Sequence, residues 1–210
     1  MYLVIKVKNL IRVAKQRWGT AAAKQALWND EFSGGRWNCL EASVGDPVYQ
    51  YIEKYSGGGS ILDLGCGSGS TGVELAIGSY REYTGVDISD VAIEKARAKS
   101  MACQRGEKNH FVQGDISSYI PDHPYEVILF RDSIYYQTRR KIKQMIDRCC
   151  RYLTKDGVII MRHWSTKGGE GIMDCLRDRC ATIEKYSCGS GPLVAVLRPT
   201  GGVASGAERK

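Results

Sequence analysis

The chain has 210 residues, of which 43% are hydrophobic and 25% charged, the balance of a soluble protein with one domain and a sizeable core. No apolar run approaches the ~20 residues of a membrane span. The net charge of +7 favours anionic partners, nucleic acid included. The basic residues are scattered, and the densest cluster, RRKIK at 139–143, is more typical of a solvated helix face than of a nucleic-acid patch.

The N-terminal stretch MYLVIKVKNLIRVAKQRW is apolar but interrupted by Lys6, Lys8 and Arg12. It lacks the small-residue cleavage site of a signal peptide, so we expect it in the mature structure. Its pattern predicts an amphipathic cap segment that packs on the domain, with a membrane-surface helix as the alternative. Helical patterns cover 10–28 and 44–55.

From residue 60 onward, short apolar runs alternate with amphipathic ones. Helices are predicted at 70–79, 89–104, 139–153 and 169–180, the second with Ser89 as its N-cap. Strands are predicted at 61–65, 82–87, 109–115, 125–131 and 157–163. This alternation indicates a parallel sheet flanked by helices, which binds ligands at the carboxyl ends of its strands.

The C-terminal part breaks the alternation. Two apolar runs around CGSG, within 181–199, predict an antiparallel hairpin, and 200–210 a loose tail. We therefore expect a single domain made of an N-terminal helical lid (1–55), a core (56–199) and the tail.

The eight cysteines do not form the pattern of a disulfide framework or a zinc site. Cys149 and Cys150 are adjacent, Cys66 lies in a glycine-rich loop, and no C-x-x-C pair exists. We expect reduced thiols in a cytoplasmic protein, and no metal site.

The glycine-rich stretch ILDLGCGSGSTG contains two overlapping motifs, G-x-G-x-G from Gly65 and the dinucleotide-type G-x-G-x-x-G from Gly67. The strand ends at Leu64, so the turn begins at Gly65, and the third glycine of a dinucleotide motif would fall on Ser70. The register therefore favours G-x-G-x-G and places Gly72 in the first turn of the helix.

Three acidic residues stand at the ends of three successive predicted strands. Asp63 lies inside an apolar strand, where a carboxylate is costly to bury unless it meets a cation or hydrogen-bond donors. Asp87 stands about 20 residues downstream, where an acid can accept ribose hydroxyls, and Asp115 could receive an adenine amino group. Each could instead be a helix N-cap or turn former.

Together these motifs resemble those of the class I S-adenosylmethionine-dependent methyltransferases of small-molecule type, over roughly residues 55–199. ILDLGCGSGS is similar to the first family motif, GVDIS to the acidic motif after it, GDIS to the second, YEVILFRDSIYY to the fourth and CCRYLTKDGVIIM to the fifth. The resemblance implies an α/β fold: a Rossmann-like, seven-stranded, mostly parallel sheet with helices on both faces and a C-terminal antiparallel hairpin.

The resemblance implies S-adenosylmethionine as cofactor. The glycines would face the methionine part of the cofactor, and Asp63 would bind its ammonium. Asp87 would bind the ribose and Asp115 the edge of the adenine, while the apolar neighbours of these acids would contact the adenine. With two further contacts from the first and fourth motifs, the implied cofactor-binding residues are Asp63, Gly65, Cys66, Gly67, Gly69, Asp87, Ile88, Asp115, Ile116 and Arg131.

Methyl transfer from a sulfonium depends on alignment, and an O–H or N–H acceptor can also need a general base. His163, at the end of the fifth strand, is the candidate base, with a structural histidine as the alternative. Asp132 and Tyr135 follow the fourth strand and could polarise the acceptor; for Tyr136 we expect aromatic packing.

The segment ALWNDEFSGGRWNCLE is similar to the lid of some small-molecule methyltransferases. Trp28, Phe32 and Trp37 would wall the cavity, and Arg36 could pair with the cofactor's carboxylate. Ordinary packing of a helix pair is the alternative.

The stretch FRDSIY departs from the (N/D)PP(Y/F) motif of enzymes that methylate exocyclic base amines. We therefore expect a cytoplasmic methyltransferase that acts on an oxygen or nitrogen of a small-molecule metabolite. The alternatives are a tRNA or rRNA methyltransferase, a catalytically silent cofactor-binding partner subunit, and a dinucleotide oxidoreductase.

Overall fold

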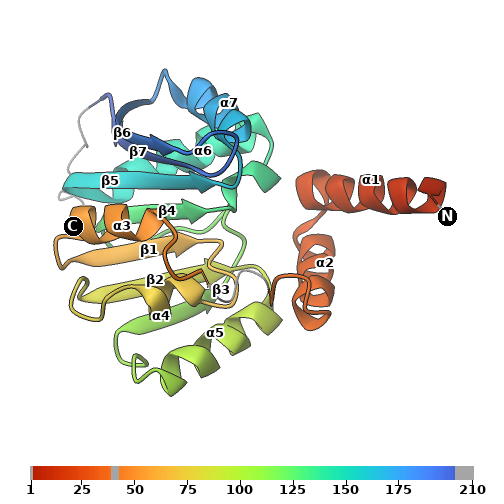
Figure 1. Ribbon diagram of the computed structural model, residues 1–210, viewed down its shortest axis with the longest axis horizontal. Helices are drawn as coiled ribbons and strands as arrows, with labels where there is room; N and C mark the ends of the chain where they lie inside the picture. Colours follow the sequence, from red (N-terminus) through yellow and green to blue (C-terminus); the bar gives the residue numbers. More distant parts are fainter. Residues whose placement is uncertain (1, 39–42, 202–210) are drawn as a thin grey trace.

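The structure is a computed structural model that describes residues 2–38 and 43–201. Its centre is a seven-stranded sheet in the order β3-β2-β1-β4-β5-β7-β6 (Figure 1). The first five strands are parallel, and β7 lies antiparallel between β5 and β6, which confirms the predicted fold class and hairpin. The strands are β1 (Ser60–Leu64), β2 (Glu82–Asp87), β3 (Asn109–Gln113), β4 (Tyr125–Arg131), β5 (Leu153–His163), β6 (Cys180–Ser187) and β7 (Leu193–Pro199).

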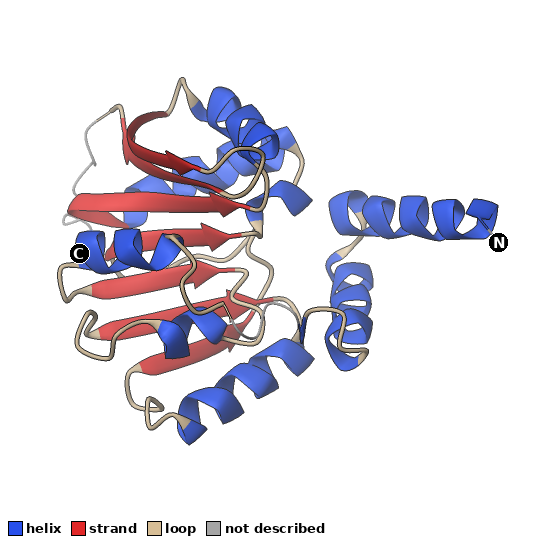
Figure 2. Ribbon diagram, in the orientation of Figure 1, coloured by secondary structure: helices blue, strands red, loops and turns tan. Residues whose placement is uncertain are grey.

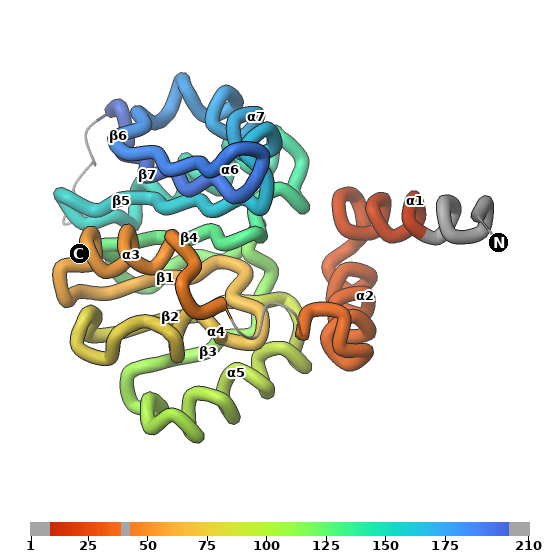
Figure 3. The backbone as a smooth tube through the Cα atoms, in the orientation of Figure 1, coloured from red at the N-terminus to blue at the C-terminus, as the bar shows by residue number. Residues whose placement is uncertain are grey.

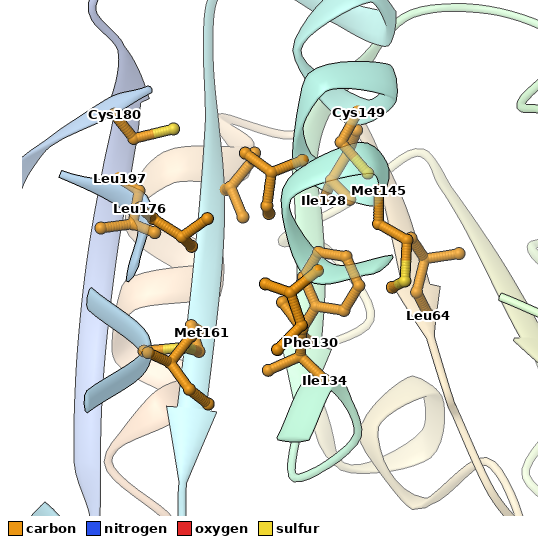
Figure 4. Packing of buried hydrophobic residues seen from close by; sticks show 14 of the residues in the cluster. Leu64, Ile128, Phe130, Ile134, Met145, Cys149, Met161, Leu176, Cys180 and Leu197 are labelled. Carbon is orange, nitrogen blue, oxygen red and sulfur yellow. The ribbon is translucent and has the colours of Figure 1, made fainter. Parts of the chain in front are cut away.

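Helices cover both faces of the sheet (Figure 2). They are α3 (Val48–Ser56), α4 (Ser70–Glu74), α5 (Asp90–Ala102), α6 (Arg139–Cys149) and α7 (Thr166–Leu176), with 3-10 turns at Ile134–Tyr136 and Cys150–Tyr152. Because side chains alternate along a strand, β4 sends Ile128 and Phe130 toward α6 and α7 (Figure 4), and Val127 and Leu129 toward α3 and α5. Burial on both faces fixes the strand register and with it the edge at which the strands end.

The helix predicted at 70–79 ends at Glu74, because side chains from elsewhere occupy its last carbonyls. Tyr80 and Asn109 both donate to the Gly72 carbonyl, at 3.0 and 2.9 Å. Arg105 donates to the carbonyls of Gly72 and Leu75. Asn109 and Arg105 are distant in the sequence, so the local pattern overestimates the helix.

Two further boundaries differ from the sequence prediction. Strand β5 starts at Leu153, four residues early, because a bulge in β5 between Leu153 and Val158 lets the buried Leu153 pair with Tyr125. Helix α7 starts at Thr166, with Ser165 as its N-cap. Glycine is needed near its start because a Cβ on Gly168 would overlap the ring of His163.

The helix predicted at 10–28 is in fact two helices, α1 (Tyr2–Trp18) and α2 (Ala21–Ser33). A Cβ on Gly19 would overlap the Lys15 carbonyl, and Thr20 caps α2 by accepting the Ala23 N–H at 3.2 Å. Both helices lie beyond the carboxyl edge of the sheet, and α1 projects away from it (Figure 3). One side of α1 contacts α2 and the cavity through Arg12 and Gln16, whereas Leu10 and Trp18 are exposed, so the packing of this segment as a cap stays a prediction.

The helix predicted at 44–55 is α3, which packs on the sheet with Val48 and Ile52 fully buried. Helix α3 therefore packs with the core, while the role of α1 and α2 as a lid stays a prediction. The predicted tail falls mostly on 202–210, outside the described residues.

In the described ranges, the seven cysteines are free thiols; Cys39 lies outside them. The same ranges contain no group of three or more His, Cys, Asp or Glu side chains arranged to hold a metal. No helix in them has the length and apolar character that crossing a membrane requires.

Candidate active site

A cavity lies between the carboxyl edge of the sheet and the N-terminal helices. Its floor comes from the segments that follow β1, β2, β3 and β4, and its roof from α2, with Gln16 of α1 and Trp37 beside it. This is the edge at which parallel α/β sheets bind ligands.

The glycine-rich loop has the register expected from the end of its strand. Gly65 directly follows β1 with φ +90°, and a Cβ there would overlap Ser133. Gly69 is the N-cap of α4 with φ +76°, so Ser70 is the first helical residue. Gly72 lies inside α4, where its missing Cβ makes room for Tyr83 and Asn109. Gly72 therefore serves packing, which confirms the register G-x-G-x-G.

Asp63 is fully buried and lines the cavity. The Tyr83 hydroxyl donates to its Oδ2 at 2.6 Å, while its Oδ1 has no hydrogen-bond partner in the described part of the chain. Burial raises the pKa of Asp63 to about 6, against the opposing effects of Tyr83 and Arg131. A cationic donor in the cavity would satisfy Oδ1, whereas a pyrophosphate would be repelled.

Asp87 and Asp115 lie on the same wall. Asp87 accepts the Gly67 N–H on Oδ2 at 3.0 Å and the Ser89 N–H on Oδ1 at 2.9 Å, and burial raises its pKa. Asp115 caps the turn after β3 by accepting the Ser117 N–H at 2.8 Å. Both line the cavity together with Ile88 and Ile116, which directly follow them in the sequence. Each carboxylate oxygen keeps a lone pair for a ligand donor.

The opposite side of the cavity is aromatic. Trp28, Phe32 and Trp37 line it, as predicted. The Trp28 ring meets Tyr136 edge-on at 4.8 Å and lies 5.8 Å from Trp37. Tyr136 also lines the cavity, so its role is wider than the packing we expected. Lys24, Trp28 and Phe32 recur at four-residue spacing and therefore share one face of α2.

Asp132 lines the cavity with a positive φ of 52°, which is uncommon for any residue but glycine. Arg162 pairs with its Oδ2, whereas its buried Oδ1 has no hydrogen-bond partner among the described residues. Burial raises the pKa of Asp132, although Arg162 and Arg131 oppose this. Strained backbone beside an unsatisfied buried oxygen is typical of a functional site.

Ion pairs behind Asp132 hold it in place. Asp46, just before α3, binds Arg162 at 3.0 Å and Arg131 at 3.6 Å. The Arg131 guanidinium also donates to the hydroxyls of Tyr49 and Thr71, at 3.0 and 3.2 Å, and it lines the cavity. Sequence reasoning missed the role of Asp46, because its partners are more than 80 residues away.

Tyr135, Cys66, Gly65 and Gly67 also line the cavity, whereas His163, Arg36 and Gly69 are not part of its lining. His163 packs beside the Tyr135 ring at 4.6 Å and accepts the Ser165 N–H on Nδ1 at 3.0 Å. Burial lowers its pKa. Arg36 is half exposed, with its guanidinium 3.9 Å from Glu31.

Sequence reasoning also missed Lys24, a buried lysine that lines the cavity from α2. Its ammonium lies 3.4 Å from the side-chain oxygen of Gln137. Burial and then the nearby charge of Lys141 lower the pKa of Lys24. The local sequence of α2 contains no signal that separates a buried lysine from an exposed one.

Comparison with known proteins agrees with this geometry. Residues 56–198 match a family model described as Methyltransferase domain. A 27-O-demethylrifamycin SV methyltransferase from Amycolatopsis mediterranei (strain S699) is 22% identical over 54% of this chain. The match covers 44% of that relative, so this chain spans less than half of its length.

Two solved structures show the fold. The N-methyltransferase NodS of Bradyrhizobium japonicum WM9, in complex with S-adenosylhomocysteine, has a TM-score of 0.64 at 17% identity and covers 82% of this chain and 99% of its own. The 1,6-didemethyltoxoflavin-N1-methyltransferase of Burkholderia thailandensis, with its substrate and S-adenosylhomocysteine, reaches 0.71 at 17% identity over 86% of this chain and 88% of its own. The chain thus belongs to the methyltransferase domain family.

Proposed function

We propose that this protein transfers a methyl group from S-adenosylmethionine to an oxygen or nitrogen atom of a small molecule. The observation that carries the proposal is a cavity with two chemically different halves under one roof. The half next to β1, β2 and β3 is acidic, whereas the half under α2 is aromatic and contains Asp132.

The acidic half fits a cofactor that carries an ammonium and a ribose. Asp63 Oδ1 would accept from the ammonium, since it has no other partner in the described ranges. Asp87 would accept the ribose hydroxyls, and Asp115 the adenine amino group between Ile88 and Ile116. The backbone of the glycine-rich loop would face the methionine part, with Gly65, Cys66, Gly67 and Gly69 as its residues.

We assign the cofactor's carboxylate to Arg131, because its guanidinium lines the cavity close to Asp63 and Thr71. Arg36 is the other candidate. Its exposed fraction of 53% and its position near Glu31 favour a role in holding the segment after α2.

The bound cofactor supplies an electrophilic methyl group on a sulfonium. The protein's contribution is alignment, worth roughly 7–11 kcal/mol at its limit, and removal of the acceptor's proton. The geometry of Asp132 suits the removal of that proton, because its free Oδ1 can accept a hydrogen bond from an O–H or N–H while Arg162 fixes the other oxygen. Tyr135 and Tyr136 would pack against the acceptor.

His163 remains a candidate general base, beside the Tyr135 ring. His163→Ala should lower turnover and leave cofactor binding intact. Unchanged turnover would remove His163 from the mechanism.

Calorimetry and a transfer assay test the proposal. S-adenosylhomocysteine should bind and NAD should not; the reverse would mean a dinucleotide enzyme. With radiolabelled cofactor, a panel of amines, phenols and alcohols should yield a methylated product. Labelled RNA with salt-sensitive binding would favour the nucleic-acid alternative, and cofactor binding without any transfer would favour a silent partner subunit.

A further inference from the structure

Helix α1 turns one side toward the rest of the protein and the other toward solvent. Arg12 pairs with Glu31 of α2, and Gln16 is buried and lines the cavity. These two residues are four positions apart and therefore share one stripe of the helix.

The opposite stripe of α1 is apolar and exposed. Leu10 and Trp18, eight positions apart, have exposed fractions of 70% and 69%, and Ile11 beside them has 52%. Large apolar side chains in a continuous exposed stripe indicate an interaction surface. α1 lies next to α2 and projects past it, away from the sheet (Figure 1).

The charge of α1 indicates which kind of surface would cover its apolar stripe. The helix contains no acidic residue and carries five basic ones, at positions 6, 8, 12, 15 and 17. Lys15 is exposed one turn after Ile11, and the Arg17 guanidinium lies 6.0 Å from the Trp18 ring. An apolar stripe flanked by cations, with an indole at its end, is the composition of helices that lie in the interface of an anionic bilayer.

Two other coverings fit less well. A second copy of α1 would bring two all-basic helices together with no acidic residue on either to neutralise them. Insertion across a bilayer does not suit the helix either, because its 17 residues include five charges.

We propose that α1 is a membrane-surface helix that docks the protein on anionic bilayers. Its apolar stripe enters the headgroup region, its lysines and arginines meet lipid phosphates, and the Arg12–Gln16 side holds the cavity next to the membrane. The proposal rests on α1 alone and does not depend on the proposed methyl transfer.

Cosedimentation of the full chain with large vesicles provides the test. The protein should bind vesicles of phosphatidylcholine with 30 mol% phosphatidylglycerol at low salt, bind pure phosphatidylcholine weakly, and release when salt is raised. Leu10→Ser with Trp18→Ser should weaken anionic binding at least about tenfold, and Lys15→Glu about tenfold, as two units of charge are lost.

Ile77→Ser with Met101→Ser is the matched control, since these exposed apolar side chains (51% and 70%) lie away from α1. S-adenosylhomocysteine affinity verifies that every variant is folded. No binding to anionic vesicles, or equal loss in the control, would overturn the proposal. A dimer seen by light scattering that the Leu10/Trp18 variant disrupts would overturn it in favour of self-association.

Discussion

The acidic half of the cavity, which we propose as the cofactor half, and the aromatic half, which we propose as the acceptor half, are built differently. Asp63 and Asp87 belong to buried strands, and backbone N–H groups of Gly67 and Ser89 fix the Asp87 carboxylate. Helix α2 covers the acceptor half. Few polar contacts hold α2 to α5 and to the segment before α5. Among them, the Lys95 ammonium donates to the Phe32 carbonyl at 2.7 Å and the Ser89 hydroxyl donates to the Asn29 side-chain oxygen at 2.7 Å.

This difference indicates which half of the cavity is rigid and which half can open. A cofactor site set into a sheet opens only when the core opens, whereas a helix held by a few side chains can open locally at lower cost. Phe32 joins the two halves, since it lies over Gly67 of the glycine-rich loop. A bound cofactor would therefore support the roof, and the roof would shield the cofactor from water.

The largest expected effect is a loss of cofactor affinity. Asp87→Ala should lower S-adenosylhomocysteine affinity about 100-fold by calorimetry, because two charge-assisted hydrogen bonds are lost. Asp156→Ala removes an exposed acid instead and should bind normally. A folded Asp87→Ala protein with unchanged affinity would contradict the cofactor placement.

The next variant separates chemistry from binding. Asp132→Asn should lower turnover about 100-fold, because the acceptor's proton loses its base, while S-adenosylhomocysteine affinity changes little. Asp147→Asn is the control: Asp147 also pairs with an arginine, Arg179 at 2.8 Å, but lies outside the cavity lining. Equal turnover in both variants would remove Asp132 from the reaction.

The pH dependence of binding tests Asp63. Its pKa of about 6 means that cofactor affinity should be constant above pH 7 and fall by up to about tenfold per pH unit below 6, as the carboxylate takes up a proton. Asp63→Asn should flatten this profile at lower affinity. An identical profile in the variant would assign the titration to another group.

The same pKa predicts the stability of the ligand-free protein. In the folded protein the pKa of Asp63 is raised above the usual value of 3.8. The contribution of Asp63 to the free energy of unfolding is therefore most favourable below pH 3.8 and is lost as pH rises through about 6. The loss is about 3 kcal/mol. Asp63→Asn should therefore raise the melting temperature at pH 8 while it weakens cofactor binding.

The smallest expected effect concerns the roof. Trp28→Ala should raise KM for the acceptor up to about tenfold and change cofactor affinity less, because the edge-on contact with Tyr136 is lost. Trp18→Ala, an exposed tryptophan of α1, is the control in a vesicle-free assay. Equal KM values would place the acceptor elsewhere.

The sequence by itself determined the sheet, the hairpin and the positions of the cofactor acids. Strand ends, the glycine register and the acid after each strand are local features, and parallel strands bring their carboxyl ends to one edge. That is why Gly65, Asp63 and Asp87 could be named before the structure. Their roles toward the cofactor remain predictions.

The tertiary structure alone decided how α4 ends, where α1 points and which polar atoms stay unsatisfied. Side chains from β3 and the loop before it end α4, Glu31 of α2 holds one side of α1, and Asp46 orients the arginines that leave one oxygen of Asp132 open. Each of these depends on partners that are distant in the chain. Hydrophobic periodicity records which face of an element is buried, and it carries no information about which distant group that face will meet.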